Sequence, residues 1–376
     1  MHVTGSNLFG QWPFKSLILQ DFQRVHNDDK IRPRNFDYET ATLVSINWSY
    51  NIYQESGRFY VSGGWQGKED QLIQVDLPED CNLEDTNYTM AGNDYNLFLV
   101  NKKTKILWIM KLETGKVTKK IKFDIETPQN NATNDDNDCI IKNIVTNNSM
   151  LCLTSRGNVY VGFLPCLLDT NHCVGKICDI ECGYEHYVLL SEAGRVYTWG
   201  NGRRLQLGHG DLTNQESPTE VEALAGIKIT KIKAGGWHCL ALSEFGDLYA
   251  WGLNDVGQLG ITKGINSQSS KLEVQNYGLP TLVDLFVNNM TEININVKDI
   301  ACGTRHSAIV LEDDSVWTTG NNKYGQLGFS PDAYANVNGF KKSYFLGETV
   351  TKIICGPWST VINTNKYLIF YFKIHL

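Results

Sequence analysis

The chain has 376 residues, a net charge of −7 and 42% hydrophobic residues, so it is long enough to bury a sizeable core. Its acidic balance provides no general electrostatic attraction to nucleic acid. The N-terminus does not show the pattern of a signal peptide. Ten cysteines without such a signal favour a reducing compartment over secretion. The apolar run 367–372 is too short to cross a bilayer.

The first residues match the second half of a repeat that becomes clear only later in the chain. Residues 4–11 (TGSNLFGQ) align with residues 251–258 (WGLNDVGQ). Weak copies of the repeat follow at 46–65, 90–110 and 144–165, and in the first of these Ser49 stands where the clear copies have histidine. The stretch 126–138 is rich in Asn and Asp, as is typical of a solvated loop between repeats.

Three clear copies match one another without gaps, at 180–208, 232–260 and 300–328. In the second copy, His238, Leu240 and Leu242 alternate with smaller residues, a period of two that predicts a strand with one buried face. The next turn has Gly246 where a positive φ is needed, and Asp314 stands there in the third copy. Each copy therefore predicts a β-hairpin, and the copies must stack because so small a sheet cannot bury its face alone. The positions that we expect to be structural are Gly183, His186, Gly200, Gly235, His238, Gly252, Gly303, His306 and Gly320.

The end of the chain carries the half repeat that is missing at its beginning. Residues 353–363 match the opening of a clear copy without its histidine, so we expect 1–12 and 353–363 to share one sheet. Pairing them would close the stack into a ring with no open edge. Residues 366–376 depart from the repeat and are expected to form a divergent tail. The connection 262–297 is longer than its counterpart 209–231, and such an insertion is either a partner site or a tolerated surface loop.

The second clear copy resembles the repeat of the regulator of chromosome condensation family, from Gly-Gly-Trp-His at 235–238 to Gly-Gln-Leu-Gly at 257–260. The resemblance is strong over 180–362, fair over 1–70 and thin over 80–165. It implies an all-β fold, a seven-bladed β-propeller made by residues 1–365 as a single domain. A propeller of the tryptophan-aspartate type would show Gly-His and Trp-Asp pairs at shorter spacing, and that pattern does not fit.

Within this family the chain is most similar to a small single-propeller branch. That likeness implies a non-enzymatic, chromatin-associated protein that acts as an adaptor for a JmjC-domain oxygenase, in histone demethylation or arginine hydroxylation. It implies a nuclear location, with the cytoplasm as an additional one. It also implies a monomeric propeller that reaches chromatin through histones or a partner, without strong direct DNA binding. An alternative is a guanine-nucleotide exchange factor for a Ran-like GTPase, the activity of the family's founding member. We favour the adaptor because the chain begins inside a repeat, without that member's basic tail. A weaker third reading is an adaptor for ubiquitin ligases, as in some multidomain relatives.

The residues themselves offer no catalytic constellation. There is no nucleophile elbow, phosphate-binding loop or zinc-protease motif, so neither an enzyme nor a cofactor is predicted. The three repeat histidines belong to separate copies around a wide ring, whereas metal ligands must lie about 2 Å from one ion. We therefore expect each imidazole to bond backbone near its own hairpin. The same reading, without a metal, applies to the irregularly spaced His172, Cys173, Cys178 and Cys182.

One repeat position suggests a binding surface. The residue before the repeat histidine is aligned as Trp48, Glu185, Trp237, Arg305 and Trp358. These residues should lie on one face of the ring near the mouth of its channel, and Trp237, Arg305, Trp358 and Trp48 come from consecutive blades. Tryptophan and arginine are enriched in binding hot spots, so this arc is a candidate docking surface for a protein partner. The alternative is that each indole only packs between neighbouring blades.

Overall fold

The computed structural model describes residues 1–25, 36–66, 71–81, 87–123, 138–262, 275–287, 291–292, 295–344 and 348–365. These residues form β-strands and one short 3-10 helix, Glu222–Leu224. No helix in this part of the chain is long and apolar enough to cross a membrane. The tail 366–376 and nearly all of the loop 126–138 lie outside the described residues.

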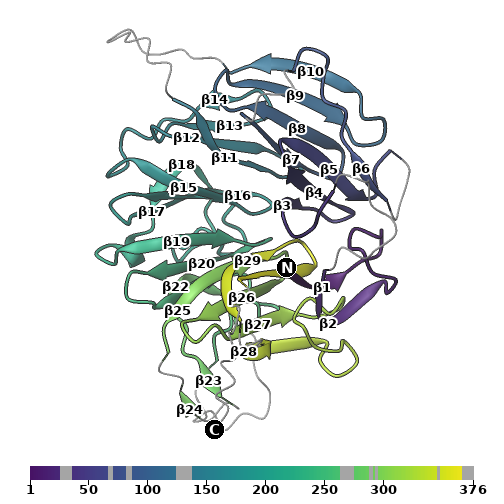
Figure 1. The fold of residues 1–376 in the computed structure, drawn as a ribbon. Coiled ribbons are helices and arrows are strands. Elements are labelled where there is room, and N and C mark those ends of the chain that lie inside the picture. Colours follow the sequence, from purple (N-terminus) through teal and green to yellow (C-terminus); the bar gives the residue numbers. More distant parts are fainter. Residues whose placement is uncertain are drawn as a thin grey trace, which may run out of the picture.

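Seven four-stranded antiparallel sheets surround a common centre and form the blades of a β-propeller (Figure 1). Six blades follow the chain order, from the first strand at the central channel to the fourth at the outside. Their strands are β3 (Thr42–Ile46), β4 (Tyr50–Glu55), β5 (Arg58–Gly63) and β6 (Leu72–Gln74); β7 (Tyr88–Gly92), β8 (Asn96–Asn101), β9 (Ile106–Lys111) and β10 (Val117–Lys122); β11 (Ile140–Val145), β12 (Met150–Thr154), β13 (Val159–Val161) and β14 (Cys166–Leu167); β15 (Ile177–Cys182), β16 (His186–Ser191), β17 (Val196–Gly200) and β18 (Gln215–Glu220); β19 (Ile229–Ala234), β20 (His238–Ser243), β21 (Leu248–Gly252) and β22 (Tyr277–Leu282); and β25 (Val297–Cys302), β26 (His306–Leu311), β27 (Val316–Asn321) and β28 (Asn336–Tyr344).

The seventh blade joins the two ends of the chain. Its strand order is β2 (Ile18–Arg24), β1 (His2–Ser6), β30 (Ser359–Asn365) and β29 (Thr349–Cys355). Val3 lies opposite Val361 and Thr4 opposite Thr360, so the first strand fills the place that a third strand takes in the other blades. The ring closure predicted from the terminal half repeats is confirmed, and with it the seven-bladed fold.

The clear repeats form the predicted hairpins. His238 at the start of β20 lies opposite Gly252 at the end of β21, and the other two clear copies keep this register. Gly246 has a φ of 87° and Asp314 a φ of 62°, so both turn residues adopt the left-handed conformation expected of them. Gly252 has a φ of 106°, and a side chain there would approach the carbonyl oxygen of Trp237 to 2.6 Å. Only glycine fits that strand exit.

In the β3–β6 blade the sequence alignment is one residue out of register. Tyr50, and not Ser49, lies opposite Gly63 and therefore occupies the histidine position. No histidine marks the start of the second strand in this blade, so the shift is not visible in the sequence. As a result Trp48 stands two residues before that strand, whereas Trp237 stands immediately before β20.

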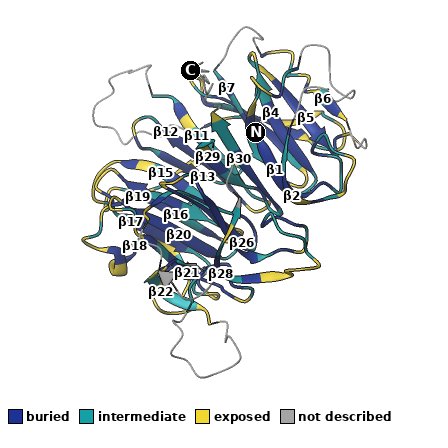
Figure 2. Cartoon of the chain, turned by 60° about the horizontal axis from the view of Figure 1, so that its bottom comes forward, coloured by how far each residue is buried: buried dark blue, intermediate teal, exposed yellow. Residues whose placement is uncertain are grey.

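The hydrophobic core is divided among the gaps between blades. In one cluster, for example, Phe59 and Val61 of β5 pack with Leu97 and Trp108 of the next blade. Figure 2 shows that buried residues fill the middle of the strands, while exposed residues gather at turns and outer strands. Each blade therefore depends on its neighbours for burial, as expected of a repeat architecture. Part of the connection 262–297 is regular structure. It contains β22, the outer strand of a blade, and a hairpin of β23 (Phe286–Val287) and β24 (Thr291–Glu292).

Candidate functional site: the mouth of the channel

The turn between the first and second strands reaches the same end of the channel in all seven blades. Together these turns line a cavity of about 360 Å³. Its walls are residues 46–48, 92–94, 145–147, 182–184, 234–236, 302–304 and 355–358. Trp48 and Trp358 belong to the wall, and Trp237 and Arg305 follow directly after wall residues. The candidate residues from the sequence thus lie around one opening.

Backbone hydrogen bonds tie several mouth turns to their neighbours. The amide of Tyr184 donates to the carbonyl of Gly236 at 3.1 Å, and the amide of Gly236 donates to the carbonyl of Thr304 at 3.1 Å. The amide of Thr304 in turn donates to Pro357 at 3.3 Å. The Tyr184 hydroxyl also lies 2.9 Å from Thr304 Oγ1, across the intervening blade. A side chain at Gly236 would come within 2.6 Å of the Thr304 carbonyl oxygen, so this glycine permits the close approach. Hydrogen bonds between neighbouring blades therefore hold these turns in place around the mouth, which we call the rim.

Four half-buried aromatic side chains, Phe9, Trp48, Tyr324 and Trp358, form what we call the aromatic cluster. The rings of Trp48, Tyr324 and Trp358 contact one another edge to face, with centroids 5.4 to 5.9 Å apart. Phe9 adds an edge contact to Trp48 at 6.1 Å. Such T-shaped pairs stabilise one another beyond their area burial. Phe9 and Tyr324 lie in loops that follow the third strand of a blade, and the sequence analysis missed both.

Trp237 and Arg305 also contact the third-strand loop of the preceding blade. The guanidinium of Arg204 lies 4.5 Å from the ring centroid of Trp237. The ring of Tyr184, from the same blade as Arg204, contacts Trp237 edge to face with centroids 4.9 Å apart. Arg305 forms an ion pair with Asp255. Each predicted hot-spot residue is thus half-buried and packed against a neighbouring blade, which suits both an inter-blade contact and a preorganised binding surface.

The weak blades show what stands at this position when the repeat degenerates. The amide–carbonyl contact that links Gly183 to His186 recurs between residues 93 and 96 and between 146 and 149. Asn96 and Ser149 therefore occupy the histidine position, and the residue before it is Tyr95 in one blade and Asn148 in the other. Tyr95 is 68% exposed, so it is an additional aromatic on this face. No histidine marks either blade, and only the strand register could identify these residues.

The repeat histidines do not bond backbone of their own hairpins, and that expectation is wrong. Nε2 of His238 lies 2.9 Å from Ser307 Oγ in the next blade, and that hydroxyl donates to the carbonyl of Gln258 at 2.7 Å. Because the hydroxyl has only one proton, His238 donates from Nε2. His306 makes the same contact with Thr360 at 3.1 Å. Each histidine therefore joins two blades.

Burial keeps these imidazoles neutral. It lowers the pKa of His186, His238 and His306 to about 3. His186 places Nε2 3.1 Å from the sulfur of Cys239, again in the following blade. The three histidines are fully buried and belong to separate blade interfaces, where they hold the ring together.

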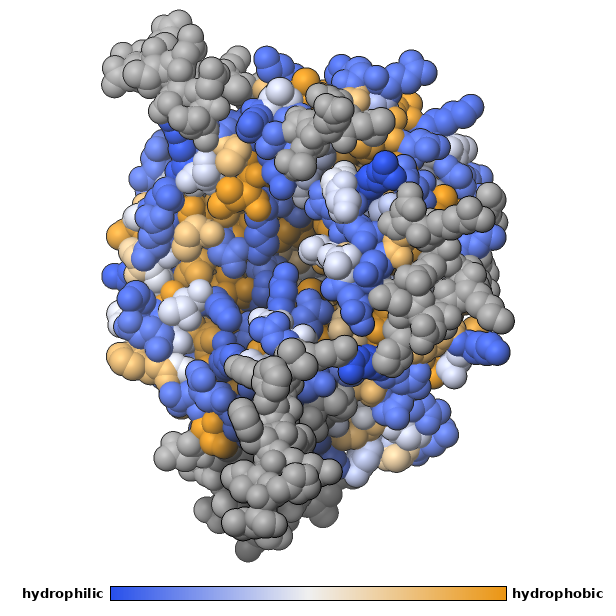
Figure 3. Space-filling view, viewed as in Figure 1, coloured by the Kyte–Doolittle hydropathy of each residue, from blue (hydrophilic) through white to orange (hydrophobic). Residues whose placement is uncertain are grey.

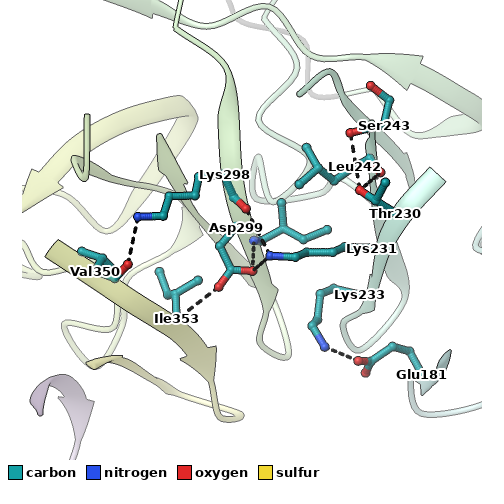
Figure 4. Close-up of polar contacts among 11 residues, drawn as sticks. Glu181, Thr230, Lys231, Lys233, Leu242, Ser243, Lys298, Asp299, Val350 and Ile353 are labelled. Atoms are coloured by element: carbon teal, nitrogen blue, oxygen red, sulfur yellow. Dashed lines mark hydrogen bonds and ion pairs between the residues drawn. The ribbon is translucent and has the colours of Figure 1, made fainter. Parts of the chain in front are cut away.

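Below the mouth, oppositely charged side chains alternate along the first strands. Lys142 of β11 contacts Asp179 of β15 at 2.6 Å, and Lys231 of β19 contacts Asp299 of β25 at 2.9 Å. Figure 4 shows the second of these pairs beside the ion pair between Lys233 and Glu181. Burial disfavours the charged form of Glu181, but its two lysine neighbours outweigh burial and hold its pKa below the ordinary value. The wall is charge-balanced across these strands.

The remaining cluster of possible metal ligands is occupied by other contacts. His172 Nε2 lies 2.7 Å from the carbonyl oxygen of Pro218, and Cys178 donates to Leu190. Burial raises the pKa of the Cys173 thiol to about 11. Across the described ranges no group of three His, Cys, Asp or Glu side chains has the geometry to hold a metal ion.

Comparison with known proteins identifies the same repeats that form the blades. One model of the regulator of chromosome condensation (RCC1) repeat matches residues 193–242 and 246–310, and a second model matches 177–206, 229–258 and 297–326. RCC1 domain-containing protein 1 of Mus musculus is 34% identical over 215 residues, which cover 50% of this chain and 55% of the mouse protein. The chain thus spans about half the length of that relative.

Solved structures that match nearly the whole chain include a human and a yeast protein. Human WBSCR16 has a TM-score of 0.74 at 16% identity, with 98% of this chain and 99% of that chain covered. Prp20p of Saccharomyces cerevisiae has a TM-score of 0.71 at 16% identity, with coverage of 97% and 91%. At this identity the likeness shows the fold alone. The chain is a seven-bladed propeller, and three of its blades match models of the regulator of chromosome condensation repeat.

Proposed function

We propose that the chain is a chromatin-associated, non-enzymatic adaptor that docks a protein partner at the mouth of its channel. The enzyme that we infer it serves is a JmjC-domain oxygenase, as the resemblance to the single-propeller branch implies. The observation that carries the docking role is the aromatic cluster at the rim, with Trp237 and its stacked Arg204 alongside. Large, partly desolvated aromatic and arginine side chains provide most of the energy of protein interfaces.

The rim suits this role because its side chains are already ordered. The edge-to-face contacts fix the rings, and the backbone bonds between turns fix the loops that carry them. A partner that covers the rim therefore loses little of the rim's conformational entropy, which otherwise opposes binding.

A second candidate is nucleotide exchange on a Ran-like GTPase. It is favoured by the likeness to Prp20p, whose structure is described together with its binding to Gsp1p and histones. The likeness extends to the fold only, so the adaptor remains the preferred proposal.

Capture from nuclear extract with quantitative mass spectrometry tests the adaptor. Wild-type protein should enrich a JmjC-domain oxygenase, and a Trp358→Ala, Trp237→Ala variant should lose most of that enrichment while remaining folded. Phe245→Ala is the matched control, because Phe245 is an exposed aromatic at a turn between β20 and β21, at the other end of the blade. Equal enrichment by wild type and the double variant would refute the docking site.

Exchange activity is tested separately with purified components. Release of labelled nucleotide from Ran should proceed at its intrinsic rate in the presence of the propeller. A clear acceleration at micromolar protein would replace the adaptor with the exchange factor.

A further inference from the structure

The charge of the chain is divided very unevenly among the blades. Residues 87–123, which form the β7–β10 blade, contain eight lysines and only two carboxylates, a net charge of +6. The whole chain carries −7, so the remainder carries −13. The overall charge that disfavours nucleic acid thus conceals one strongly basic blade.

Most of these lysines are exposed and free of ion pairs. Lys105 is buried against Asp138, and Lys120 pairs with Asp80. The other six make no ion pair with any residue that the structure describes, and all but the half-buried Lys102 are exposed. They are Lys102, Lys103, Lys111, Lys116, Lys119 and Lys122.

The free lysines follow the outer edge of the blade from end to end. Lys119 and Lys122 belong to β10, the outermost strand of the sheet. Lys102 and Lys103 lie in the turn at one end of β9, and Lys111 and Lys116 flank the turn at its other end. Six residues of strand span about 20 Å, so the charges form a straight strip rather than a pocket. In Figure 1, β10 forms the upper edge of the molecule, where Figure 3 shows mostly hydrophilic side chains.

We propose that this edge, which we call the lysine strip, binds the sugar-phosphate backbone of duplex nucleic acid. A duplex presents one negative charge per about 1.7 Å of axis, so about a dozen charges pass along a 20 Å strip. Strand alternation places Lys119 and Lys122 on opposite faces of β10, and the lysines can therefore approach phosphates from both sides of the blade edge. Lysine ammonium groups bind phosphates as point charges, without reading the sequence.

The geometry favours a phosphate backbone over an acidic peptide. A peptide added to an edge strand gains specificity from pockets for its alternate side chains. The exposed residues of β10 apart from its lysines are only Val117 and Thr118, which provide no such pocket. A further role of edge lysines is to prevent association between sheets, and the experiment below separates the two roles.

Fluorescence anisotropy with a duplex of about 30 base pairs and random sequence tests the strip. Wild-type protein should bind with a Kd in the range of about 1–100 µM at about 50 mM salt, and log K should fall against log salt with a slope of about −2 to −4. Lys119→Glu, Lys122→Glu should weaken binding about tenfold or more and flatten the slope. The substitution keeps the edge charged, so edge protection alone predicts no change in the monomeric state and no change in duplex affinity.

Lys176→Glu, Lys228→Glu is the control, because it changes the net charge equally at two exposed lysines of other blades. This variant should bind within about twofold of wild type. Absence of duplex binding at low salt, or equal losses in both variants, overturns the proposal. So does tighter binding of a polyglutamate peptide than of the duplex. The assay contains no protein partner, so its result is independent of the docking site at the mouth.

Discussion

The two halves of the ring solve the same packing problem with different chemistry. In the blades from β15 to β28, each interface is joined by a buried histidine, a hydroxyl or thiol of the next blade and the carbonyl of a glutamine. In the β3–β6 blade, Tyr50 takes the histidine position and donates instead to the carbonyl of Asn93 at 2.7 Å. Asn51 and Ser62 of that blade both donate to the carbonyl of Gln11, as Ser307 does to Gln258. Different residue types can therefore supply the bond across a blade interface at this position.

The two halves meet in the blade shared by the termini, and the largest effect is expected there. Deleting residues 1–7 removes β1 and exposes the edge of β30. We expect the midpoint of thermal unfolding to fall by several degrees, since the loss of a whole strand costs several kcal/mol and each kcal/mol shifts a domain of this size by roughly 1 °C. Differential scanning calorimetry measures the change. A melting temperature within about two degrees of wild type would show that closure contributes little.

Acid should lower the stability of the blades from β15 to β28, which contain the clear repeats, before that of the weak blades. The histidine pKa is about 3 in the folded state and about 6.5 in the unfolded state, so the unfolded chain binds more protons between these values. Stability is therefore fully present above about pH 6.5 and is lost as the pH falls toward 3. Tyr50, Asn96 and Ser149 replace histidine in the weak blades and add no such titration. Hydrogen exchange at pH 5 compared with pH 7 should show earlier loss of protection in β16, β20 and β26. Uniform loss around the ring would contradict this.

Removing one histidine should lower the stability by less than the deletion of residues 1–7 does, but the loss should still be large. His238→Ala leaves a cavity and breaks the bond to Ser307, for which we expect a loss of about 2–4 kcal/mol in the free energy of unfolding. Urea denaturation at pH 7 measures it. The variant should also lose less stability than wild type between pH 7 and pH 5, because one titrating group is gone. An unchanged pH dependence would show that His238 is not among the groups responsible.

The smallest loss of stability is expected from a substitution in the β3–β6 blade, one of the weak repeats. Tyr50→Phe removes only the hydroxyl that bonds Asn93 and should cost about 1–2 kcal/mol, measured by the same denaturation. Ser49→Ala is the control suggested by the corrected register and should be nearly neutral. If Ser49→Ala proved the more damaging of the two, the assignment of Tyr50 to the histidine position would be wrong.

The sequence predicted what depends on local geometry. The strand alternation around His238, the left-handed residues Gly246 and Asp314, and the terminal half repeats are all visible as short patterns, and each is confirmed. What crosses from one blade to the next was not predictable. The partners of His238 and Trp237 are Ser307 and Arg204, which are far away in sequence and come together only through the ring. The same reason explains the error at Ser49, because only pairing with Gly63 fixes the register there.

The pairing of β1 with β30 has a consequence for synthesis of the protein. His2 pairs with Ile362, so β1 must wait for this partner until all the residues between the two have been synthesised. At about 5–20 residues per second, that delay is roughly 20–70 s. During this interval β2 can cover one edge of β1, but the other edge stays open to pairing with other chains. A chain that stops before β30 would never cover this edge, so incomplete copies would keep an exposed strand that favours aggregation.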